Sequence, residues 1–135
     1  MKHSKFQFKG FKIERSLIER NQNKPSKQVA INFKPFGEIN TENASFQLNL
    51  GVKIEDKNKS FKIEIDAVAN FYFEKETELS NLDNYFYVNA PAILFPYIRA
   101  YISTLTTLSG FEAINLPTLN MSKIGKDLKE NTKEI

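Results

Sequence analysis

The 135-residue chain contains no cysteine and no tryptophan, and its single histidine is His3. Without cysteine it cannot form disulfides, thiolate metal sites or thiol nucleophiles. One histidine cannot build a histidine-containing metal site or a nucleophile–base pair. The five glycines are scattered and form no phosphate-binding loop. We therefore expect a protein that is not an enzyme and that carries no metal and no cofactor.

Charge is nearly absent from one long segment. Between Tyr87 and Met121 only Arg99 and Glu112 are charged, although 26% of the whole chain is charged. A helix with one side in water normally carries charges on that side. The segment is also too interrupted, by prolines and a Ser/Thr stretch, to span a membrane. We expect other subunits or an apolar client to cover it.

Composition favours one folded domain. Hydrophobic residues make up 41% of the chain, and 12 of them are phenylalanine. The charged N-terminus lacks the apolar run of a signal peptide, which predicts a cytoplasmic protein. The net charge is +3, but basic residues are interspersed with acidic ones, whereas nucleic-acid modules gather basic residues on one face. We assign residues 1–121 to a single domain and residues 122–135 to a charged tail, either a short helix or disordered.

The N-terminal third contains alternating apolar residues with one change of phase. Phe6 and Phe8 alternate, and the pattern resumes after Gly10. A glycine at such a slip predicts a β-bulge within one bent strand over residues 5–20. Residues 21–27 are polar, and residues 28–37 are less regular and include a proline. We expect a crossing loop that ends in a short strand near residues 38–41.

The clearest pattern predicts a hairpin. Apolar residues alternate with polar ones over residues 46–54 and again over 61–73, which is typical of strands with one buried face. A four-residue loop between them suits a tight connection. The predicted register pairs Glu55 with Ser60, Val52 with Ile63, Leu50 with Ile65 and Lys53 with Lys62.

A helix is predicted after a polar connection over residues 74–84. Asn89 is a suitable N-cap and Pro91 a suitable first residue, and Gly110 is a typical end signal. Pro96 either kinks this helix or starts a second one. The apolar stripe comprises Leu94, Ile98, Tyr101, Leu105 and Leu108, widened by Ile93, Tyr97 and Ile102, and the opposite side is Ser103, Thr104, Thr106 and Thr107.

Two further segments place apolar side chains in predicted loops. Phe33 and Phe36 flank a proline in the first, and Phe111, Ile114 and Leu116 lie in the second. Such side chains either fill the core of the domain or line an exposed apolar groove.

The run from Asn89 to Met121 resembles a known family. LFPYIRAYIS, followed by a glycine, Phe111 and INLPTLNM, is similar to the signature segment of SecB-type export chaperones over about 30 residues. The resemblance implies an α+β fold: a four-stranded antiparallel sheet with a long helix in the C-terminal half and a short second helix. It also implies a dimer of dimers that assembles through the long helix, with Tyr97, Tyr101, Ile102 and Leu105 at the interface.

The same resemblance implies a function in protein export. Family members are ATP-independent holdases that bind unfolded preproteins in apolar grooves, so the family pattern assigns the groove to Phe33, Phe36, Phe111, Ile114 and Leu116. It assigns docking of the translocase motor ATPase to Glu64 and, less closely, Glu19. The tail SKIGKDLKENTKEI departs from the acidic tail of members dedicated to export.

Three alternatives follow from these patterns. A SecB-like chaperone of a toxin–antitoxin system, with an antitoxin as its client, fits the non-acidic tail. A sheet that stacks single-stranded nucleic acid on Phe6, Phe8 and Phe11 fits the basic first strand. A subunit scaffold without a client fits the charge-poor helix alone.

Overall fold

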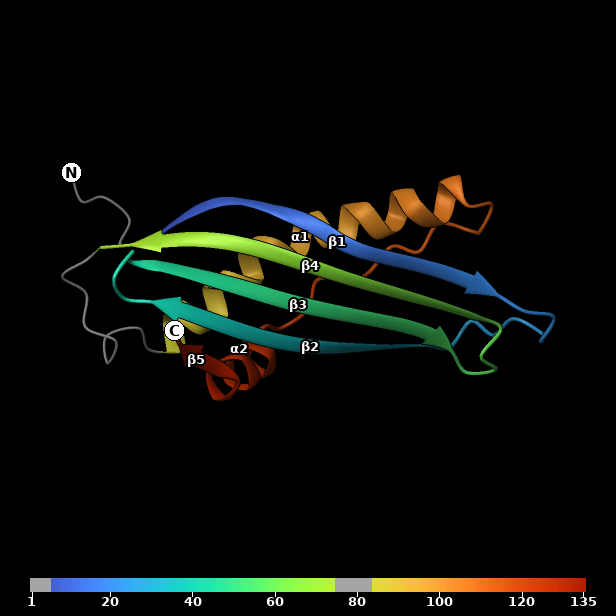
Figure 1. The fold of residues 1–135 in the computed structure, drawn as a ribbon. Coiled ribbons are helices and arrows are strands. Elements are labelled where there is room, and N and C mark those ends of the chain that lie inside the picture. Colours follow the sequence, from blue (N-terminus) through green and yellow to red (C-terminus); the bar gives the residue numbers. More distant parts are fainter. Residues whose placement is uncertain (1–5, 75–83) are drawn as a thin grey trace.

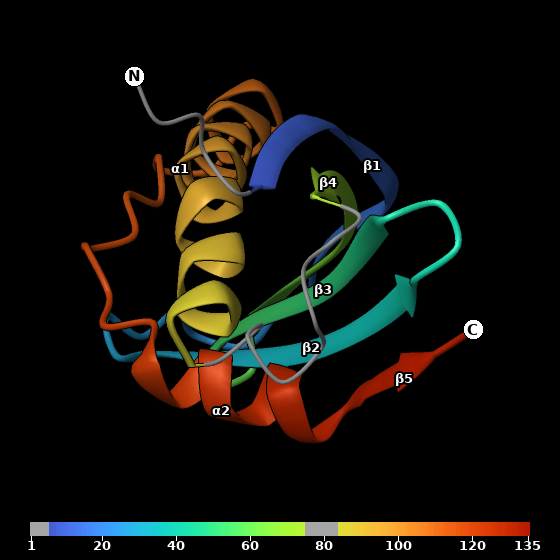
Figure 2. The same cartoon turned by 90° about the vertical axis from the view of Figure 1, so that its left-hand side faces the viewer.

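The computed structural model describes residues 6–74 and 84–135, which form one sheet and two helices. The elements are β1 (Phe6–Arg20), β2 (Val29–Asn40), β3 (Ser45–Asp56), β4 (Phe61–Phe73), α1 (Asn84–Leu108), α2 (Ser122–Glu130) and β5 (Thr132–Glu134). The strand order is β1-β4-β3-β2-β5. Figure 1 shows the sheet in front of both helices, and Figure 2 shows that α1 and α2 lie on the same side of it.

The predicted α+β class is confirmed, but the sheet has five strands and not four. β1 to β4 are antiparallel to their neighbours, whereas β5 runs parallel to β2 from the pair Gly37–Thr132 to the pair Ile39–Glu134. β5 has only three residues, Thr-Lys-Glu, which is too short for a periodic pattern. The short segment is extended because it pairs with β2, and no pattern in its own sequence predicts a strand.

The bent first strand and its bulge are confirmed. The register between β1 and β4 shifts between Phe8 and Phe11, where Gly10 has a φ of 112°. Such a backbone angle favours glycine because a Cβ crowds the chain there. A second shift follows between Ile13 and Arg15, so β1 is interrupted twice.

The β3–β4 hairpin is confirmed, but the predicted register is wrong by two residues. Glu55 pairs with Lys62 and Lys53 with Glu64, so opposite charges face each other instead of two lysines. In the same register Val52 pairs with Ile65 and Leu50 with Ala67. The connection has four residues, as predicted, but it begins one residue later, at residue 57. Asp56 closes it, because its carboxylate accepts hydrogen bonds from the backbone N–H groups of Ser60 (2.6 Å) and Phe61 (3.3 Å).

The predicted crossing loop over residues 28–37 is wrong, because these residues belong to the regular strand β2. The crossing is made by the polar segment before it, which hydrogen-bonds to the β3–β4 turn through Asn23 Nδ2 to Asn58 O (3.0 Å) and Asn58 Nδ2 to Lys24 O (3.0 Å). Pro35 is tolerated because it pairs with Leu50 on one side and lies at the sheet edge on the other.

Helix α1 begins earlier than predicted and passes through both prolines. It starts at Asn84, so Asn89 is not an N-cap and Pro91 is not the first residue, and Pro96 starts no second helix. The predicted end is confirmed: Gly110 has a φ of 82°, its N–H donates to Thr107 O, and Phe111 N donates to Thr106 O (2.9 Å). The connection expected over residues 74–84 lies mostly outside the described residues.

The buried stripe of α1 is shifted from the predicted one. Leu94, Ile98, Ile102 and Thr106 have no exposed surface, whereas Leu108 is 81% exposed and Tyr97 is 47% exposed. The buried side chains pack against the inward side chains of β3 and β4, including Leu48, Leu50, Val52, Ile54, Ile63 and Ile65. The core therefore lies between α1 and the middle of the sheet.

The C-terminal segment packs against the rest of the chain as helix α2. Ile124 and Leu128 are buried in the core, and Gly125 lies against Val88 of α1. Pro91 has no N–H to donate to the carbonyl of Tyr87, and a Cβ on Gly125 would lie 3.0 Å from that carbonyl oxygen. The boundary drawn at residue 121 between domain and tail stays a prediction.

Candidate functional site

The first pair of predicted groove residues lies on β2, on opposite faces of the strand. Phe33 points inward, and its ring meets Phe95 of α1 edge-on with centroids 5.8 Å apart. Phe36 is 36% exposed on the outer face, with Lys133 Nζ 5.5 Å from its ring. Both line a hollow of about 430 Å³ at the sheet edge, together with Lys34, Pro35, Asp127 and Asn131. This hollow is mainly apolar and lies between β2 and α2.

Phe111 lies elsewhere, next to the end of α1, and is half-buried. Its ring meets Phe61 edge-on at 5.9 Å, and the Arg20 guanidinium lies 4.0 Å above it. Arg20 also donates a hydrogen bond to the carbonyl of Ser109 (3.1 Å). Phe111 is thus held between Arg20 of β1 and Phe61 of β4, and only part of its ring is available to a ligand.

Ile114 and Leu116 follow Phe111 in an extended loop that covers the core. Leu116 is buried, and Ile114 is half-buried. The loop is fixed because the backbone N–H of Ile114 donates to the Thr106 hydroxyl (3.0 Å), which itself donates to the carbonyl of Ile102 (2.9 Å). Thr106, expected on the uncharged outer side of the helix, is instead its buried anchor. The five predicted groove residues therefore fall in two separate places.

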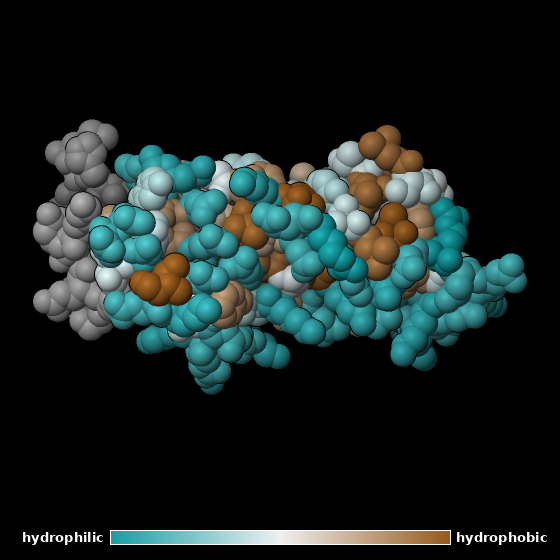
Figure 3. Space-filling model, viewed as in Figure 1, coloured by the Kyte–Doolittle hydropathy of each residue, from teal (hydrophilic) through white to brown (hydrophobic). Residues whose placement is uncertain are grey.

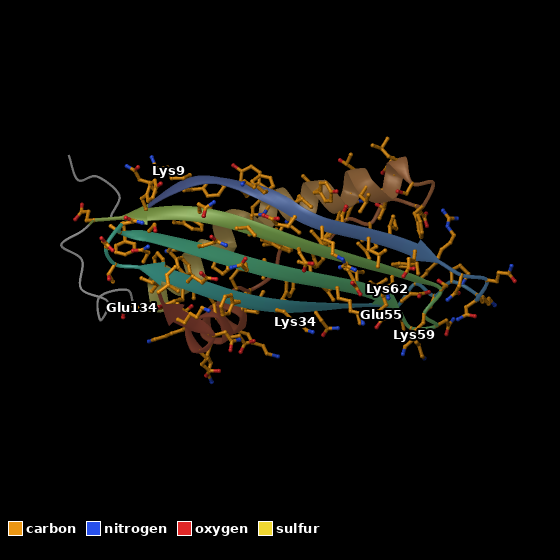
Figure 4. All side chains as sticks on the ribbon, viewed as in Figure 1. Lys9, Lys34, Glu55, Lys59, Lys62 and Glu134 are labelled. Atoms are coloured by element: carbon orange, nitrogen blue, oxygen red, sulfur yellow. The ribbon has the colours of Figure 1, made fainter. Side chains whose placement is uncertain are left out.

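The predicted docking residues lie on the outer face of the sheet, and both are ion-paired. Glu64 contacts Arg15 Nη1 at 2.9 Å and Lys62 Nζ at 3.7 Å, and Glu19 contacts the same Lys62 at 3.5 Å. The hydrogen bond from Arg15 lowers the pKa of Glu64 despite its partial burial. Figure 4 shows Lys62 and Glu55 near the same end of this face, so positive and negative charges are mixed there.

The four predicted interface residues of α1 differ in what they expose. Tyr97 packs on Phe8 (5.7 Å) and Phe11 (4.9 Å), and the hydroxyls of Tyr101 and Ser16 share a hydrogen bond of 2.8 Å. Leu105 is half-buried, and Ile102 has no exposed surface to offer a second copy. Phe8 and Phe11 are half-buried, and Tyr97 occupies part of the ring surface that nucleic-acid bases would need for stacking.

The exposed face of α1 is longer than the uncharged side predicted from the sequence and shares only Thr104 with it. Its members are uncharged and recur about every four residues: Ala92, Pro96, Ala100, Thr104 and Leu108. Hydrophobic and weakly polar residues gather over the C-terminal part of α1 in Figure 3. The four-residue spacing from residue 92 to residue 108 indicates this face in the sequence. The spacing was overlooked because the face lies beside the stronger apolar stripe.

Neither metal chemistry nor a membrane helix is indicated in the described parts of the chain. Residues 6–74 and 84–135 contain no group of three or more His, Cys, Asp or Glu side chains that could hold a metal ion. None of the helices within those ranges is long and apolar enough to cross a membrane.

Comparison with known proteins gives one family. The family model of the preprotein translocase subunit SecB matches residues 8–131. The protein-export protein SecB of Anaplasma phagocytophilum is 32% identical over 94 residues, covering 65% of this chain and 60% of the relative. An uncharacterized protein of Methanocaldococcus jannaschii is 25% identical over 117 residues, covering 87% and 66%. The chain thus spans less than two thirds of these relatives.

A solved structure has the same fold. The SecB-like chaperone of Mycobacterium tuberculosis, in complex with a ChAD peptide from the HigA1 antitoxin, superimposes with a TM-score of 0.73. The match covers 85% of this chain and 88% of the other at 17% identity, so it supports the fold alone.

Proposed function

Because this chain belongs to the SecB family, we propose that it is an ATP-independent holdase that binds unfolded preproteins through apolar surface. The observation that carries the proposal is the hollow beside Phe33 and Phe36, an apolar recess at the open end of a sheet edge. Recesses lined by apolar side chains with few polar groups are typical binding sites. The proposed clients are polypeptides whose apolar side chains are still exposed.

The expected affinity of one such site is low. Each apolar side chain that a client buries contributes roughly 1.5–3 kcal/mol. Ordering a flexible chain offsets much of that gain. Several sites on one assembly let a long unfolded chain bind at linked positions without sequence specificity. Folding of the client hides its apolar side chains, so native proteins are not held.

The test is binding of a permanently unfolded polypeptide, reduced and carboxymethylated α-lactalbumin, measured by fluorescence anisotropy. Phe36→Ala is expected to weaken binding about fivefold, because an exposed ring at the hollow is removed. Phe36 suits the test better than Phe111, since Phe111 is packed on Phe61 and its loss also affects folding.

Tyr72→Ala is the matched control. Tyr72 is 50% exposed on the outer face of β4, and Lys9 Nζ lies 5.6 Å from its ring, much as Lys133 lies over Phe36. Its loss is expected to leave binding unchanged. Equal losses in both variants, or no loss in either, would contradict the assignment of the hollow.

The client class has two candidates, export preproteins and an antitoxin. Glu64 and Glu19 are ion-paired with Arg15 and Lys62, so a motor that docks through these carboxylates must displace pairs that cost little to break at exposed positions. A relative of the same fold binds an antitoxin peptide. Binding of the purified chain to the translocase motor ATPase separates the two, and a measurable, salt-sensitive complex lost in Glu64→Gln favours export.

Assembly through α1 belongs to the same proposal. Tyr97, Tyr101 and Leu105 retain exposed or half-exposed surface, and they adjoin the uncharged face formed by Ala92, Pro96, Ala100, Thr104 and Leu108. Uncharged small residues let two backbones approach closely, whereas a helix face left in water normally carries charge. The proposed assembly is a dimer of dimers, located in the cytoplasm.

A further inference from the structure

Positive charge gathers at one end of the sheet, although basic and acidic residues are interspersed along the sequence. Residues 20–28, which connect β1 to β2, and residues 57–60, which connect β3 to β4, meet at the end where β1 and β3 finish (Figure 1). We call these two segments the basic tip. The tip contains none of the 16 acidic residues of the chain, so the remaining residues are net negative. Its basic residues are Arg20, Lys24, Lys27, Lys57 and Lys59.

Within the described residues, the four lysines of the basic tip have no acidic partner. All four are exposed, and none of them forms an ion pair. Glu19 and Glu55, on the adjoining strands, are ion-paired with Lys62 and Lys53 instead. Asp56 is buried, and its carboxylate is occupied by hydrogen bonds from the tip itself. The lysine charges are therefore available to a partner.

Hydrogen bonds between the two segments hold the lysine backbones in place. Asn21 Nδ2 donates to the carbonyl of Lys59 (2.7 Å), and Asn58 Nδ2 donates to the carbonyl of Lys24 (3.0 Å). The N–H of Lys57 donates to a carbonyl of the other segment (2.8 Å). These bonds use main-chain atoms of the lysines and not their ammonium groups. The tip thus presents a fixed cluster of positive charges that its own fold does not use.

Lys59 adopts a backbone angle for which lysine has no preference. Its φ is 54°, in the left-handed region that glycine and asparagine enter most easily, and it lies at the end of the sheet (Figure 4). Residues held at such angles often serve function and not stability. At this position the side chain adds one more positive charge to the tip, which is a contribution that glycine or asparagine cannot make.

The chemistry of the tip favours one kind of polyanion. The side-chain amides of Asn21, Asn23 and Asn58 are bonded within the tip, so they are not free to read nucleic-acid bases. Neither segment contains an aromatic residue on which single-stranded bases could stack. Lysine ammonium groups act as point charges, without the bidentate geometry of arginine. Such a cluster suits a surface of diffuse negative charge.

We propose that the basic tip docks this chain peripherally on a membrane surface rich in anionic lipid headgroups. Clusters of about four to eight lysine or arginine residues are typical of such electrostatic docking. Neither segment carries a large apolar side chain for insertion into the bilayer, so the contact is reversible. The proposal adds a place of action to the holdase function and does not depend on client binding.

The test is co-sedimentation of the full chain, without a client, with vesicles of phosphatidylcholine alone or mixed equally with phosphatidylglycerol. We expect binding to the mixed vesicles only, because only these carry negative charge. Raising the salt concentration from about 50 to about 500 mM is expected to weaken binding at least about tenfold, because salt screens the attraction. Equal binding to both vesicles, binding that salt does not weaken, or no binding to either would overturn the proposal.

A double variant, Lys57→Gln with Lys59→Asn, tests the tip itself. Each lysine near an anionic surface contributes about fivefold to binding, so we expect the double variant to bind mixed vesicles about 25-fold more weakly. The backbone hydrogen bonds of the tip are retained. Asparagine enters the left-handed region more easily than lysine, so the melting temperature is expected not to fall.

The matched control is Lys123→Gln with Lys126→Gln, which makes the same change in net charge on α2. Both lysines are exposed, and they lie outside the basic tip. This variant is expected to bind mixed vesicles within about threefold of the unmodified chain. Equal losses in the two double variants would show that net charge and not the tip controls binding, which would overturn the assignment.

Two further ligands identify a different partner. Binding of a fluorescein-labelled RNA oligomer or of polyglutamate, lost in the tip variant while mixed vesicles are not bound, would overturn the membrane assignment. Failure of vesicle binding leaves the holdase function standing, because the vesicle assay contains no client. That function is decided separately by carboxymethylated α-lactalbumin.

Discussion

At the scale of single residues, Asp56 organises the end of the sheet opposite the N-terminus. Asp56 is 3% exposed, and its carboxylate accepts hydrogen bonds from Ser60, Phe61 and the backbone N–H of Ser26 (2.9 Å) in the crossing segment. Burial alone raises the pKa of a carboxyl, but the hydrogen bonds from Ser60, Ser26 and Phe61 outweigh it and lower the pKa of Asp56 to about 2.

This shift predicts a specific acid sensitivity. Because the pKa of Asp56 is lower in the folded than in the unfolded chain, its contribution to stability is present above pH 4 and is lost as the pH falls from about 4 towards 2. Asp56→Asn is expected to lower the free energy of unfolding at pH 7 by about 1–3 kcal/mol and to flatten its pH dependence in that window. Urea unfolding at several pH values measures both.

Asp66→Asn is the control, since it changes a carboxylate whose side chain is 54% exposed. It is expected to alter the free energy of unfolding by less than about 1 kcal/mol. If Asp56→Asn keeps the full acid sensitivity of the unmodified chain, the hydrogen bonds described for Asp56 do not control its ionisation.

Individual residues were predictable where their chemistry is local. Gly10 and Gly110 were identified because a bulge and a helix end each require a backbone angle that glycine adopts easily. The role of Asp56 was missed because its partners include Ser26, 30 positions away in sequence. The positive φ of Lys59 (54°) was missed because lysine, unlike glycine, does not indicate such an angle in a sequence.

At the scale of elements, the contact between α1 and α2 depends on the absence of a side chain. A Cβ on Gly125 would lie 2.8 Å from Val88 Cγ2 and 3.0 Å from both Val88 Cα and Tyr87 O. Two of these three atoms belong to the backbone, so a side chain can be accommodated only if α2 moves away from α1. α2 and α1 therefore pack so closely at Gly125 that no larger residue fits there without a shift.

Gly125→Ala is expected to destabilise the chain by about 1–3 kcal/mol, although alanine is the better helix former. Gly51→Ala is the matched control, because a Cβ there meets its nearest neighbour, Asp66 Oδ1, at 3.4 Å, an ordinary contact. Thermal unfolding of both variants measures the difference. A Gly125→Ala protein as stable as the Gly51→Ala protein would show that α2 is not held closely against α1.

Elements were predictable where one periodicity dominates. The β3–β4 hairpin and the C-terminal part of α1 have long, regular patterns that single-sided burial imposes. β2 was mistaken for a loop because Pro35 argues against a central strand, and the sequence does not tell that its outer side is an edge. β5 and the start of α1 depend on tertiary contacts and carry no local signal.

At the scale of the whole molecule, the two sides of the protein differ in the charge of their exposed residues. The outer sheet face carries mixed charge, with Arg15 and Lys62 each ion-paired to Glu64. The outer side of α1 carries almost none, and Leu108 near its end is 81% exposed. A charged face is stable in water, whereas an extended uncharged one indicates a surface that another protein covers.

The sequence predicted part of the candidate site, the family and the groove residues, but not the arrangement of those residues. The resemblance over residues 89–121 predicted the family, which the family match over residues 8–131 confirms. The separation of Phe33 and Phe36 from the three groove residues that follow α1 was not predictable, because residues 28–37 were expected to form a loop and instead belong to the edge strand β2. Phe33 and Phe36 are three positions apart, and in a strand such residues point to opposite sides.

We propose that copies of this chain cover the uncharged face of α1. The most direct test is the solution mass by analytical ultracentrifugation at micromolar concentration, with Ala100→Glu as the disrupting variant and Ala113→Glu as a control at an exposed loop position. We expect a mass of two or more times 15.6 kDa for the unmodified chain and the control, and a smaller species for Ala100→Glu. A 15.6 kDa monomer for the unmodified chain would contradict it.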